Sequence, residues 1–372
     1  MKVPLLDLKA QFKDIREEVL MAIEGVCDSQ SFILGQGVAL LEEDVAAYLG
    51  CRYAVGVASG SDALLLSLMA LEIQPGDEVI TVPFTFFSTA GVVSRLHAKP
   101  VFVDIQSDTF NIDPEQIERK ITSRTKAIIP VHLFGQCAAM EKVLEIANRH
   151  GVKVVEDACQ AIGAEHNGKK AGTFGYTGCF SFFPSKNLGG VGDGGLIATN
   201  DEALKELFLA LRVHGSRSDY HHDHIGLNSR LDALEAAVLR IKLKSLNGWN
   251  AKRAQNAAYY KKLFSEAGLL DEVTLPSTIS GNVHVFNQFT IRAQKRDQLI
   301  VYLKEQEVGH KVYYPVPLHL QECYQPLGYK KGDLPVSEQM ASEVLSLPIY
   351  PELSHSQMEL VVGTIKEFYE TH

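Results

Sequence analysis

A lysine set between aromatic residues and glycines is the first group in this sequence that could do chemistry. Lys186 follows the segment Ser181-Phe182-Phe183-Pro184-Ser185, and glycines then recur from Gly189 to Gly195. Glycines let the backbone approach a bulky planar ligand, and partial burial would lower the pKa of the lysine and free its amine for attack on a carbonyl carbon. Taken alone, the pattern leaves a solvated surface lysine as the alternative.

An acidic residue ends one of the apolar runs. Asp157 follows Val152-Lys153-Val154-Val155-Glu156, which has the pattern of a buried strand. A carboxylate at the carboxyl end of such a strand points into the ligand crevice, where it needs a cationic or hydrogen-bonding partner. A protonated pyridine nitrogen is one such partner. A carboxylate that caps the next helix is the alternative.

A turn of small residues could hold a phosphate. The segment Ala58-Ser59-Gly60-Ser61-Asp62-Ala63 lies between a predicted strand and a predicted helix. A helix N-terminus offers unpaired N–H groups and a partial positive charge, and Gly60 would let the backbone approach an anion. A helix cap without any ligand is the alternative.

These three features together match the needs of one cofactor, pyridoxal phosphate. The small-residue turn would hold its phosphate, Asp157 its ring nitrogen and Lys186 its aldehyde carbon. Each feature follows a different predicted strand, so all three can face one crevice. Phe86, in the segment Pro83-Phe84-Thr85-Phe86-Phe87-Ser88-Thr89, could stack on the ring, with a core phenylalanine as the alternative.

Short apolar runs alternate with amphipathic stretches from about residue 53, which predicts an α/β fold with a mostly parallel sheet covered on both faces by helices. The seven predicted strands are 53–57, 78–82, 99–103, 125–131, 153–156, 178–183 and 195–199. The predicted helices between them are 62–71, 88–96, 113–120, 140–150 and 202–211.

A long helical pattern over 233–244 continues beyond Trp249 and suggests a domain boundary near residue 245. We therefore expect a large domain over residues 1–245 and a smaller C-terminal α/β domain over 246–372. The smaller domain is predicted to hold a strand pair at 285–291 and 311–314 and a final helix at 356–369.

Composition narrows the class of protein. The 36 Lys and Arg against 45 Asp and Glu give a net charge of -9, and no basic block interleaved with aromatics reverses it, so nucleic acid is not expected as a partner. No apolar run approaches the roughly 20 residues needed to cross a bilayer. Six scattered cysteines are typical of free thiols in a cytoplasmic protein.

Two motifs point elsewhere and are rejected. The glycines from Gly190 to Gly195 match a dinucleotide-binding pattern, but that motif must open a helix, whereas here it leads into a predicted strand. The cluster His221-His222-Asp223-His224 lacks the cysteines or the helical spacing of a metal site, and we expect no metal.

With these motifs, the chain resembles the sugar aminotransferases of the DegT/DnrJ/EryC1/StrS family, within the fold-type I pyridoxal phosphate enzymes. The likeness runs essentially from end to end. It rests on the segments Pro4-Leu5-Leu6-Asp7-Leu8, Phe32-Ile33-Leu34-Gly35, Ser59-Gly60-Ser61-Asp62-Ala63-Leu64, Glu156-Asp157-Ala158-Cys159-Gln160, Phe180-Ser181-Phe182-Phe183-Pro184-Ser185-Lys186-Asn187-Leu188-Gly189 and Tyr314-Pro315-Val316-Pro317-Leu318-His319.

The resemblance implies a role for each site residue. Lys186 would hold the cofactor as a Schiff base, Asp157 would pair with the pyridine nitrogen, Gln160 would contact the ring hydroxyl and Phe86 would stack on the ring. The residues implied in phosphate binding are Gly60, Ser61, Ser181 and Asn228 of the partner subunit. The family works as a homodimer whose sites lie at the interface.

The resemblance also suggests a substrate. The stretch His224-Ile225-Gly226-Leu227-Asn228-Ser229-Arg230-Leu231-Asp232 is similar to the subgroup that aminates C3 of a nucleotide-linked 3-keto sugar, with an amino acid such as glutamate as donor, in deoxyamino-sugar biosynthesis. Enzymes acting at C4 usually carry a different residue pair after the asparagine. Arg217, Tyr313 and His319 are candidate contacts to the sugar or nucleotide, with a purely structural role as the alternative.

Three other functions stay open at this stage. Amination at C4 and dehydration are reactions of the same fold, although an intact Lys186 favours transamination because related dehydratases carry histidine in its place. A regulator that binds the cofactor without turnover is the alternative from another class, since some relatives have been proposed as regulatory.

Overall fold

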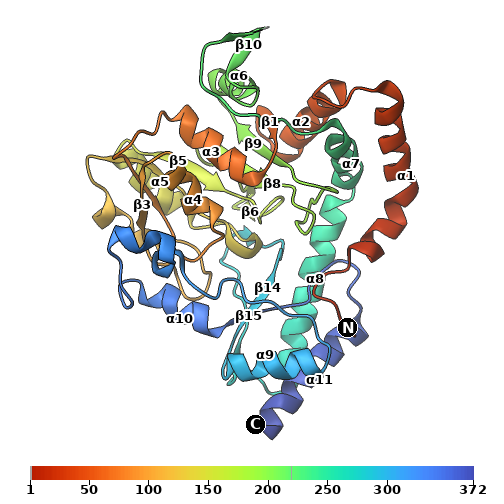
Figure 1. Cartoon of the computed structure of the whole chain (residues 1–372). Coiled ribbons are helices and arrows are strands. Elements are labelled where there is room, and N and C mark those ends of the chain that lie inside the picture. The colour runs from red at the N-terminus through yellow and green to blue at the C-terminus, as the bar shows by residue number, and fades with distance from the viewer. Residues whose placement is uncertain (1, 219) are drawn as a thin grey trace.

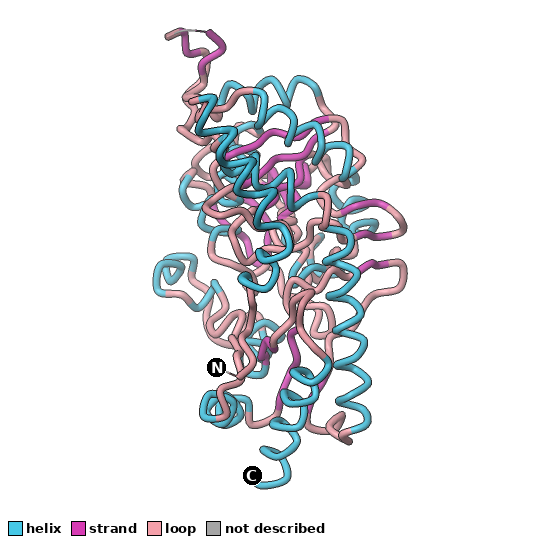
Figure 2. Tube along the Cα trace, turned by 90° about the vertical axis from the view of Figure 1, so that its right-hand side faces the viewer, coloured by secondary structure: helices cyan, strands magenta, loops and turns pink. Residues whose placement is uncertain are grey.

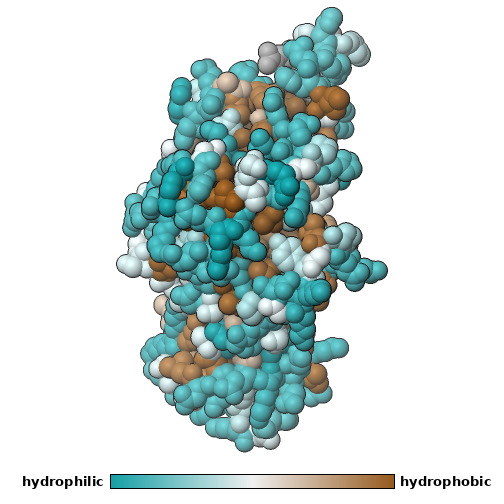
Figure 3. All heavy atoms as spheres, turned by 90° about the vertical axis from the view of Figure 1, so that its left-hand side faces the viewer, coloured by the Kyte–Doolittle hydropathy of each residue, from teal (hydrophilic) through white to brown (hydrophobic). Residues whose placement is uncertain are grey.

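The computed structural model describes residues 2–218 and 220–372, without the side chain of Arg217. It places a large sheet with its helices at one end of the molecule and the C-terminal elements at the other (Figure 1). The face drawn in Figure 3, which is the left-hand side of Figure 1 turned toward the viewer, is mostly hydrophilic, with hydrophobic atoms in small separate patches. Within the described ranges no helix has the length and hydrophobicity required to cross a membrane.

The large sheet has seven strands, and all but one run in the same direction. Across the sheet they are β1 (Tyr53–Val57), β9 (Gly195–Thr199), β8 (Thr177–Ser181), β5 (Lys153–Asp157), β4 (Thr125–Ile128), β2 (Glu78–Thr81) and β3 (Lys99–Phe102). The exception, β9, is antiparallel to both β1 and β8. The predicted α/β fold with a mostly parallel seven-stranded sheet is confirmed.

Helices cover both faces of this sheet, because successive residues of each strand point to opposite sides. Val154 of β5 packs in the cluster that includes helix α5, whereas the next residue, Val155, packs with helix α3. The helices on the α3 side are α3 (Gly60–Ala70), α4 (Ser88–Arg95) and α6 (Glu202–Leu211). Those on the other side are α2 (Gln36–Leu49), α5 (Met140–Arg149) and α7 (Ala233–Leu243), and α1 (Leu8–Ser29) lies beside α7 (Figure 1).

The predicted helix at 113–120 is wrong. The segment forms two short 3-10 turns, Pro114–Gln116 and Glu118–Lys120. The side chain of Asp113 accepts a hydrogen bond from the N–H of Glu115, and Ile117 between the two turns is buried. Eight residues with Ile117 as their one buried aliphatic side chain gain too little from burial to stabilise a longer helix.

The C-terminal elements surround a second, smaller sheet, in which β14 (Phe289–Ala293) lies between β12 (Val273–Thr274) and β15 (Val344–Leu347), antiparallel to both. Its helices are α8 (Leu246–Glu266), α9 (Arg296–Glu305), α10 (Pro335–Glu343) and α11 (His355–Thr371). Helices α8 and α11 lie side by side (Figures 1 and 2). The core of this part includes Val3 from the other end of the chain. The division at residue 245 stays a prediction.

The predicted strand pair of 285–291 with 311–314 is wrong. Residues 311–314 form no strand, and only Lys311 makes a single bridge, to Ser346 of β15. The segment instead carries Tyr314 toward Phe84, with their rings edge to face at a centroid distance of 6.0 Å. The strands that pair with β14 are the short β12 and the buried run β15, and neither belongs to the predicted pair.

Smaller elements complete the fold. The hairpin formed by β10 (Ser216–Ser218) and β11 (His221–His222) extends away from the body (Figures 1 and 2). A separate three-stranded sheet contains β13 (Asn282–Val283), β6 (Glu165–His166) and β7 (Lys169–Lys170). Three more 3-10 turns are Leu133–Gly135, Leu318–Leu320 and Glu322–Leu327.

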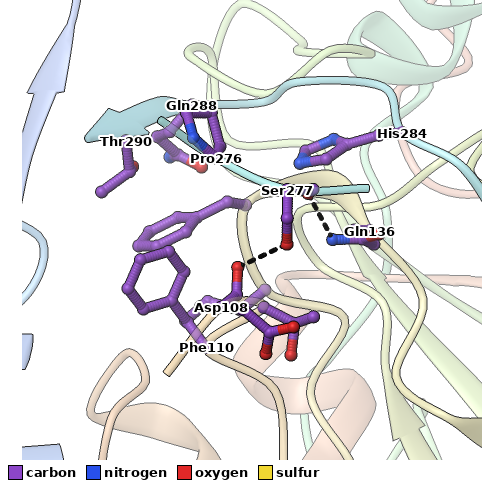
Figure 4. A pocket seen from close by; sticks show the side chains of 11 residues that line it. Asp108, Phe110, Gln136, Pro276, Ser277, His284, Gln288 and Thr290 are labelled. Atoms are coloured by element: carbon purple, nitrogen blue, oxygen red, sulfur yellow. Dashed lines mark hydrogen bonds between the residues drawn. The ribbon is translucent and has the colours of Figure 1, made fainter. Parts of the chain in front are cut away.

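A buried histidine makes the fold sensitive to acid. His284 lines a small cavity together with Phe110, Gln136 and Gln288 (Figure 4), and its ring stacks on Phe286 at 3.8 Å. Its Nδ1 accepts a hydrogen bond from the N–H of Phe286, so the ring is neutral. Burial, and after it the positive charge of Lys261, lowers the pKa of His284 to about 3.

We therefore expect the wild-type protein to lose stability between pH 7 and pH 5. In this window the unfolded histidine takes up a proton and the folded one does not, so the free energy of unfolding falls as the pH falls. The linkage gives a loss of about 2 kcal/mol. In His284→Asn the amide oxygen can accept the same N–H bond, and chemical unfolding at both pH values should show that this variant loses about 2 kcal/mol less. An equal loss in both proteins would contradict the assignment.

Candidate active site

Three strands of the large sheet end at the same edge. Asp157 is the last residue of β5, Ser181 is the last residue of β8, and Gly60 starts α3 three residues after β1. Because β1, β5 and β8 run in the same direction, their carboxyl ends face one crevice. The structure therefore brings together three regions that lie far apart in the sequence.

Lys186 lies at this edge with its amine enclosed by protein atoms, although part of the residue stays exposed. Burial lowers the pKa of Lys186, and electrostatic interactions with Cys159 and Asp157 offset part of that effect. Burial also raises the pKa of the Cys159 thiol well above its ordinary value, so that group is neutral at pH 7. Asp157 is therefore the negative charge that faces the lysine amine. A lysine of lowered pKa in this setting is suited to attack a carbonyl carbon.

Asp157 is held in place by two hydrogen bonds. Its Oδ2 accepts a bond of 2.8 Å from the hydroxyl of Thr89 on α4, and its Oδ1 accepts one of 3.2 Å from the N–H of Cys159. The hydroxyl oxygens of Thr85 and Thr89 lie 3.0 Å apart. Asp157 is 6% exposed, so its carboxylate has a fixed orientation and little contact with water. Such a group can hold a protonated ring nitrogen. Thr89 carries no local signal of this role in the sequence, because only the packing of α4 brings it to Asp157.

The turn at the start of α3 has the shape of a phosphate site. The Ser59 hydroxyl accepts a hydrogen bond from the N–H of Asp62 and caps the helix. A methyl group added to Gly60 would lie 2.7 Å from both Cys159 Sγ and Ser181 Cβ, so only glycine allows this close approach. The hydroxyls of Ser61 and Ser88 are 2.6 Å apart and join the first turns of α3 and α4. An anion at this edge would meet N–H groups and hydroxyls.

We expect Gly60→Ala to weaken cofactor binding by at least about tenfold, because the new methyl group must displace Cys159 or Ser181 from the phosphate site. Titration of the cofactor-free protein with pyridoxal phosphate measures the change. Gly37→Ala is the matched control, since nothing lies within 4 Å of a methyl group at Gly37. Equal affinities for wild type and Gly60→Ala would show that no phosphate is held there.

Gln160 forms the other side of the crevice. Its Oε1 accepts a hydrogen bond of 2.8 Å from the N–H of Phe134, and its Nε2 donates one of 3.0 Å to the hydroxyl of Tyr314. Burial raises the pKa of Tyr314, which stays neutral. The predicted site residue of this adjacent pair was Tyr313, whereas the residue bonded to Gln160 is Tyr314. The spacing of residues 313 and 314 gives no signal that distinguishes them.

The other predicted residues are placed less closely. Phe86 follows β2 and is 58% exposed, so it is not a core phenylalanine. Tyr313 is half-buried beside Tyr314, with ring centroids 5.8 Å apart. Asn228 is exposed, and its backbone bridges to Val213 at the base of the projecting hairpin. Arg217 lies in that hairpin, but its side chain is outside the described residues.

His319 does not reach the surface. It is 1% exposed, and its Nε2 lies 3.1 Å from Oε1 of Glu338. This burial argues against the direct contact to a sugar or nucleotide that the sequence suggested. The histidine instead joins the 3-10 turn at 318–320 to helix α10.

A model of the DegT/DnrJ/EryC1/StrS aminotransferase family matches residues 13–366. The chain belongs to this family. The lysine, the carboxylate and the small-residue turn fit what pyridoxal phosphate requires, and the protein is a pyridoxal phosphate-dependent aminotransferase.

Individual members of the aminotransferase family resemble the chain over almost its whole length. A pleiotropic regulatory protein of Geobacillus stearothermophilus is 52% identical over 369 residues, which are 99% of each chain. A UDP-N-acetyl-3-dehydro-alpha-D-glucosamine 3-aminotransferase of Acidithiobacillus ferrooxidans is 44% identical over 98% of this chain and 97% of its own. The crystal structure of S. venezuelae DesV in complex with a ketimine intermediate superposes with a TM-score of 0.96, at 42% identity, over 99% of this chain and 98% of that one.

Proposed function

We propose that this enzyme transfers an amino group from an amino acid, glutamate in the first instance, to C3 of a nucleotide-linked keto sugar. The observation that carries the substrate class is the 44% identity, over 98% of the chain, to a 3-aminotransferase of a UDP-linked sugar. The stretch from His224 to Asp232, similar to that of C3 enzymes, supports the same position on the ring.

Lys186 and Asp157 have different roles in the proposed reaction. Lys186 would hold the cofactor through Nζ and, with its amine free, would move a proton at the same atom. Asp157, oriented by Thr89, keeps the ring nitrogen protonated. The bound cofactor supplies an electron-accepting ring that stabilises negative charge on the donor's alpha carbon.

Other groups bind and orient the cofactor. Gln160 would contact the ring hydroxyl, and Phe86 would cover the ring. The phosphate would be held by Gly60, Ser61, Ser181 and Asn228 of the partner subunit. Of the three candidate substrate contacts, Arg217 and Tyr313 are proposed to contact the sugar or the nucleotide. His319 acts only by supporting the segment that carries Tyr313 and Tyr314.

The homodimer with shared sites is part of the proposal. Several apolar residues near the site edge or in neighbouring loops are more than half exposed, which is typical of an interface: Ile33, Phe86, Phe183 and Val191. The projecting hairpin next to Asn228 offers a segment that could reach a second subunit. Six free cysteines support the cytoplasm as the compartment.

Mixing two inactive variants tests the shared site. We expect Lys186→Ala and Asn228→Ala each to have little activity alone. If Asn228 serves the partner's site, a statistical mixture contains heterodimers with one complete site, and about a quarter of wild-type activity should return. Differently tagged chains verify that the subunits have exchanged. If they have exchanged and no activity returns, the site is not shared.

The substrate proposal is tested with pairs of keto sugars. The holoenzyme should aminate a UDP- or dTDP-linked 3-keto sugar in the presence of glutamate and leave the matching 4-keto sugar unchanged, as measured by mass spectrometry of the nucleotide product. Preferential amination of the 4-keto sugar would contradict the C3 proposal. Loss of water without gain of nitrogen would indicate a dehydratase.

A regulatory protein is the second candidate, because a relative at 52% identity is named a pleiotropic regulatory protein. The two functions differ in a half-reaction. An enzyme mixed with glutamate alone should lose the absorbance of its lysine-bound cofactor and release 2-oxoglutarate. A protein that binds the cofactor, but shows no such change with any amino acid, would be a regulator without turnover.

A further inference from the structure

The residue next to Lys186 is buried and fully engaged through its amide. Asn187 is 3% exposed. Its Nδ2 donates hydrogen bonds of 2.7 Å to Oδ1 of Asn250 and 3.0 Å to the carbonyl of Val285, and its Oδ1 accepts one of 2.8 Å from Nδ2 of Asn287. Three buried asparagines therefore meet directly behind the lysine of the site.

The partners of Asn187 come from the part of the chain that follows residue 245. Asn250 lies on α8, whereas Val285 and Asn287 lie in the segment that leads into β14. Asn250 also donates a bond of 3.1 Å to the carbonyl of Ile162, two residues beyond Gln160. The cluster thus joins the lysine segment, the loop after Asp157 and the C-terminal elements.

The hydrogen-bonding direction makes the cluster specific for an amide at 187. The two groups that face its Nδ2 are both oxygen acceptors, and the group that faces its Oδ1 is an N–H donor. A carboxylate in this place would meet two oxygens at hydrogen-bonding distance. Leaving such buried groups unpaired costs on the order of 1–3 kcal/mol each.

The backbone on both sides of Lys186 is fixed by other contacts. The N–H of Lys186 donates to the carbonyl of Phe183 at 2.8 Å, and the buried amine of Lys242 donates to the carbonyl of Gly189. Asn187 lies between these two points. A lysine side chain has four rotatable bonds, so the place of its Cα sets which atoms its amine can reach.

We propose that Asn187, held by Asn250 and Asn287, is a positioning residue that fixes Lys186 against the C-terminal elements and so places its amine near Asp157 and Cys159. This inference rests on the proposed role of Lys186. A displacement of about 1 Å in a reacting group can lower a rate by about two orders of magnitude, so this amide cluster contributes to turnover without touching substrate or cofactor.

The test compares Asn187→Asp with a matched control in the full-length protein. Asn256→Asp is the control. Like Asn187, Asn256 has a buried side-chain amide, but it lies on α8 and donates a single bond of 2.8 Å to the carbonyl of Tyr350, away from Asn187. Asn287→Ala is the milder second variant, which removes one of the three bonds and is available should Asn187→Asp fail to fold.

The first readout uses the cofactor-free protein and does not depend on activity. The rate at which an amine reagent modifies Lys186 is followed against pH by peptide mass spectrometry. Asp157 and Cys159 are the titratable groups that face the amine. In Asn287→Ala, which adds no charge, we expect the midpoint to rise toward that of an ordinary lysine, because the amine leaves its enclosed position. In Asn187→Asp the new carboxylate would raise the midpoint by its charge as well. The control should keep the wild-type midpoint.

The second readout is kinetic. We expect kcat of the holoenzyme to fall at least about tenfold in the Asn187 and Asn287 variants, with less than a twofold change in KM for glutamate, whereas Asn256→Asp lowers Tm alone. If the variants lose Tm like the control but keep the wild-type midpoint and kcat, the cluster is structural and the proposal is wrong. Should the protein prove to lack aminotransferase activity, the modification midpoint still tests the positioning role separately.

Discussion

Lys186→Ala is expected to lower turnover by at least about a thousandfold, since the protein would lose both the covalent link to the cofactor and the group that moves the proton. The loss should fall on kcat in steady-state assays with glutamate and the keto sugar. Lys186→Arg should be as inactive as the alanine variant, because a guanidinium cannot lose its proton to become a nucleophile.

The fold should survive these changes. Burial disfavours the charged form of Lys186, so its removal takes away an unfavourable desolvation and leaves no buried carboxylate without hydrogen bonds. We expect the Tm of cofactor-free Lys186→Ala to equal or exceed that of the cofactor-free wild type. A Tm lower by many degrees would mean that the lysine has a structural role that the contacts do not show.

Asp157→Asn should have the second largest effect, a fall in kcat of at least about a hundredfold. The amide has the same shape and can keep a hydrogen bond with Thr89, but it carries no negative charge to keep the ring nitrogen protonated. Steady-state kinetics of the variant saturated with cofactor measure the loss. Wild-type activity in Asp157→Asn would remove the carboxylate from the mechanism.

Thr89→Val separates charge from orientation at the same carboxylate. This change keeps the charge of Asp157 and removes the hydrogen bond of 2.8 Å to Oδ2. We expect a loss of about tenfold or less, smaller than that of Asp157→Asn. A loss as large as that of Asp157→Asn would indicate that orientation, rather than charge, is what the carboxylate provides.

The large sheet could be predicted because its strands are short apolar runs buried on both faces. Strand β5, for example, differs from its predicted range only by including Asp157. The errors lie where pairing is decided by distant residues. Nothing local distinguishes residues 311–314, which pack against the site, from β15, which pairs with β14.

The site was predictable only in part for the same reason. Lys186, Asp157 and the turn at Gly60 follow strands in the order that one cofactor requires, so their types and spacing carry the signal. Thr89, Tyr314 and the asparagines behind Lys186 act through contacts with residues far away in the sequence. His319 shows the opposite error, since a histidine in a polar loop proved to be buried against α10.

Reduction of the holoenzyme with borohydride, followed by peptide mass spectrometry, tests whether Lys186 holds the cofactor. We expect the cofactor to become permanently attached to the peptide containing Lys186, at that side chain, and glutamate added before the reductant to prevent the attachment. Attachment to a different lysine, or to none while the enzyme remains active, would rule out Lys186 as the residue that binds the cofactor.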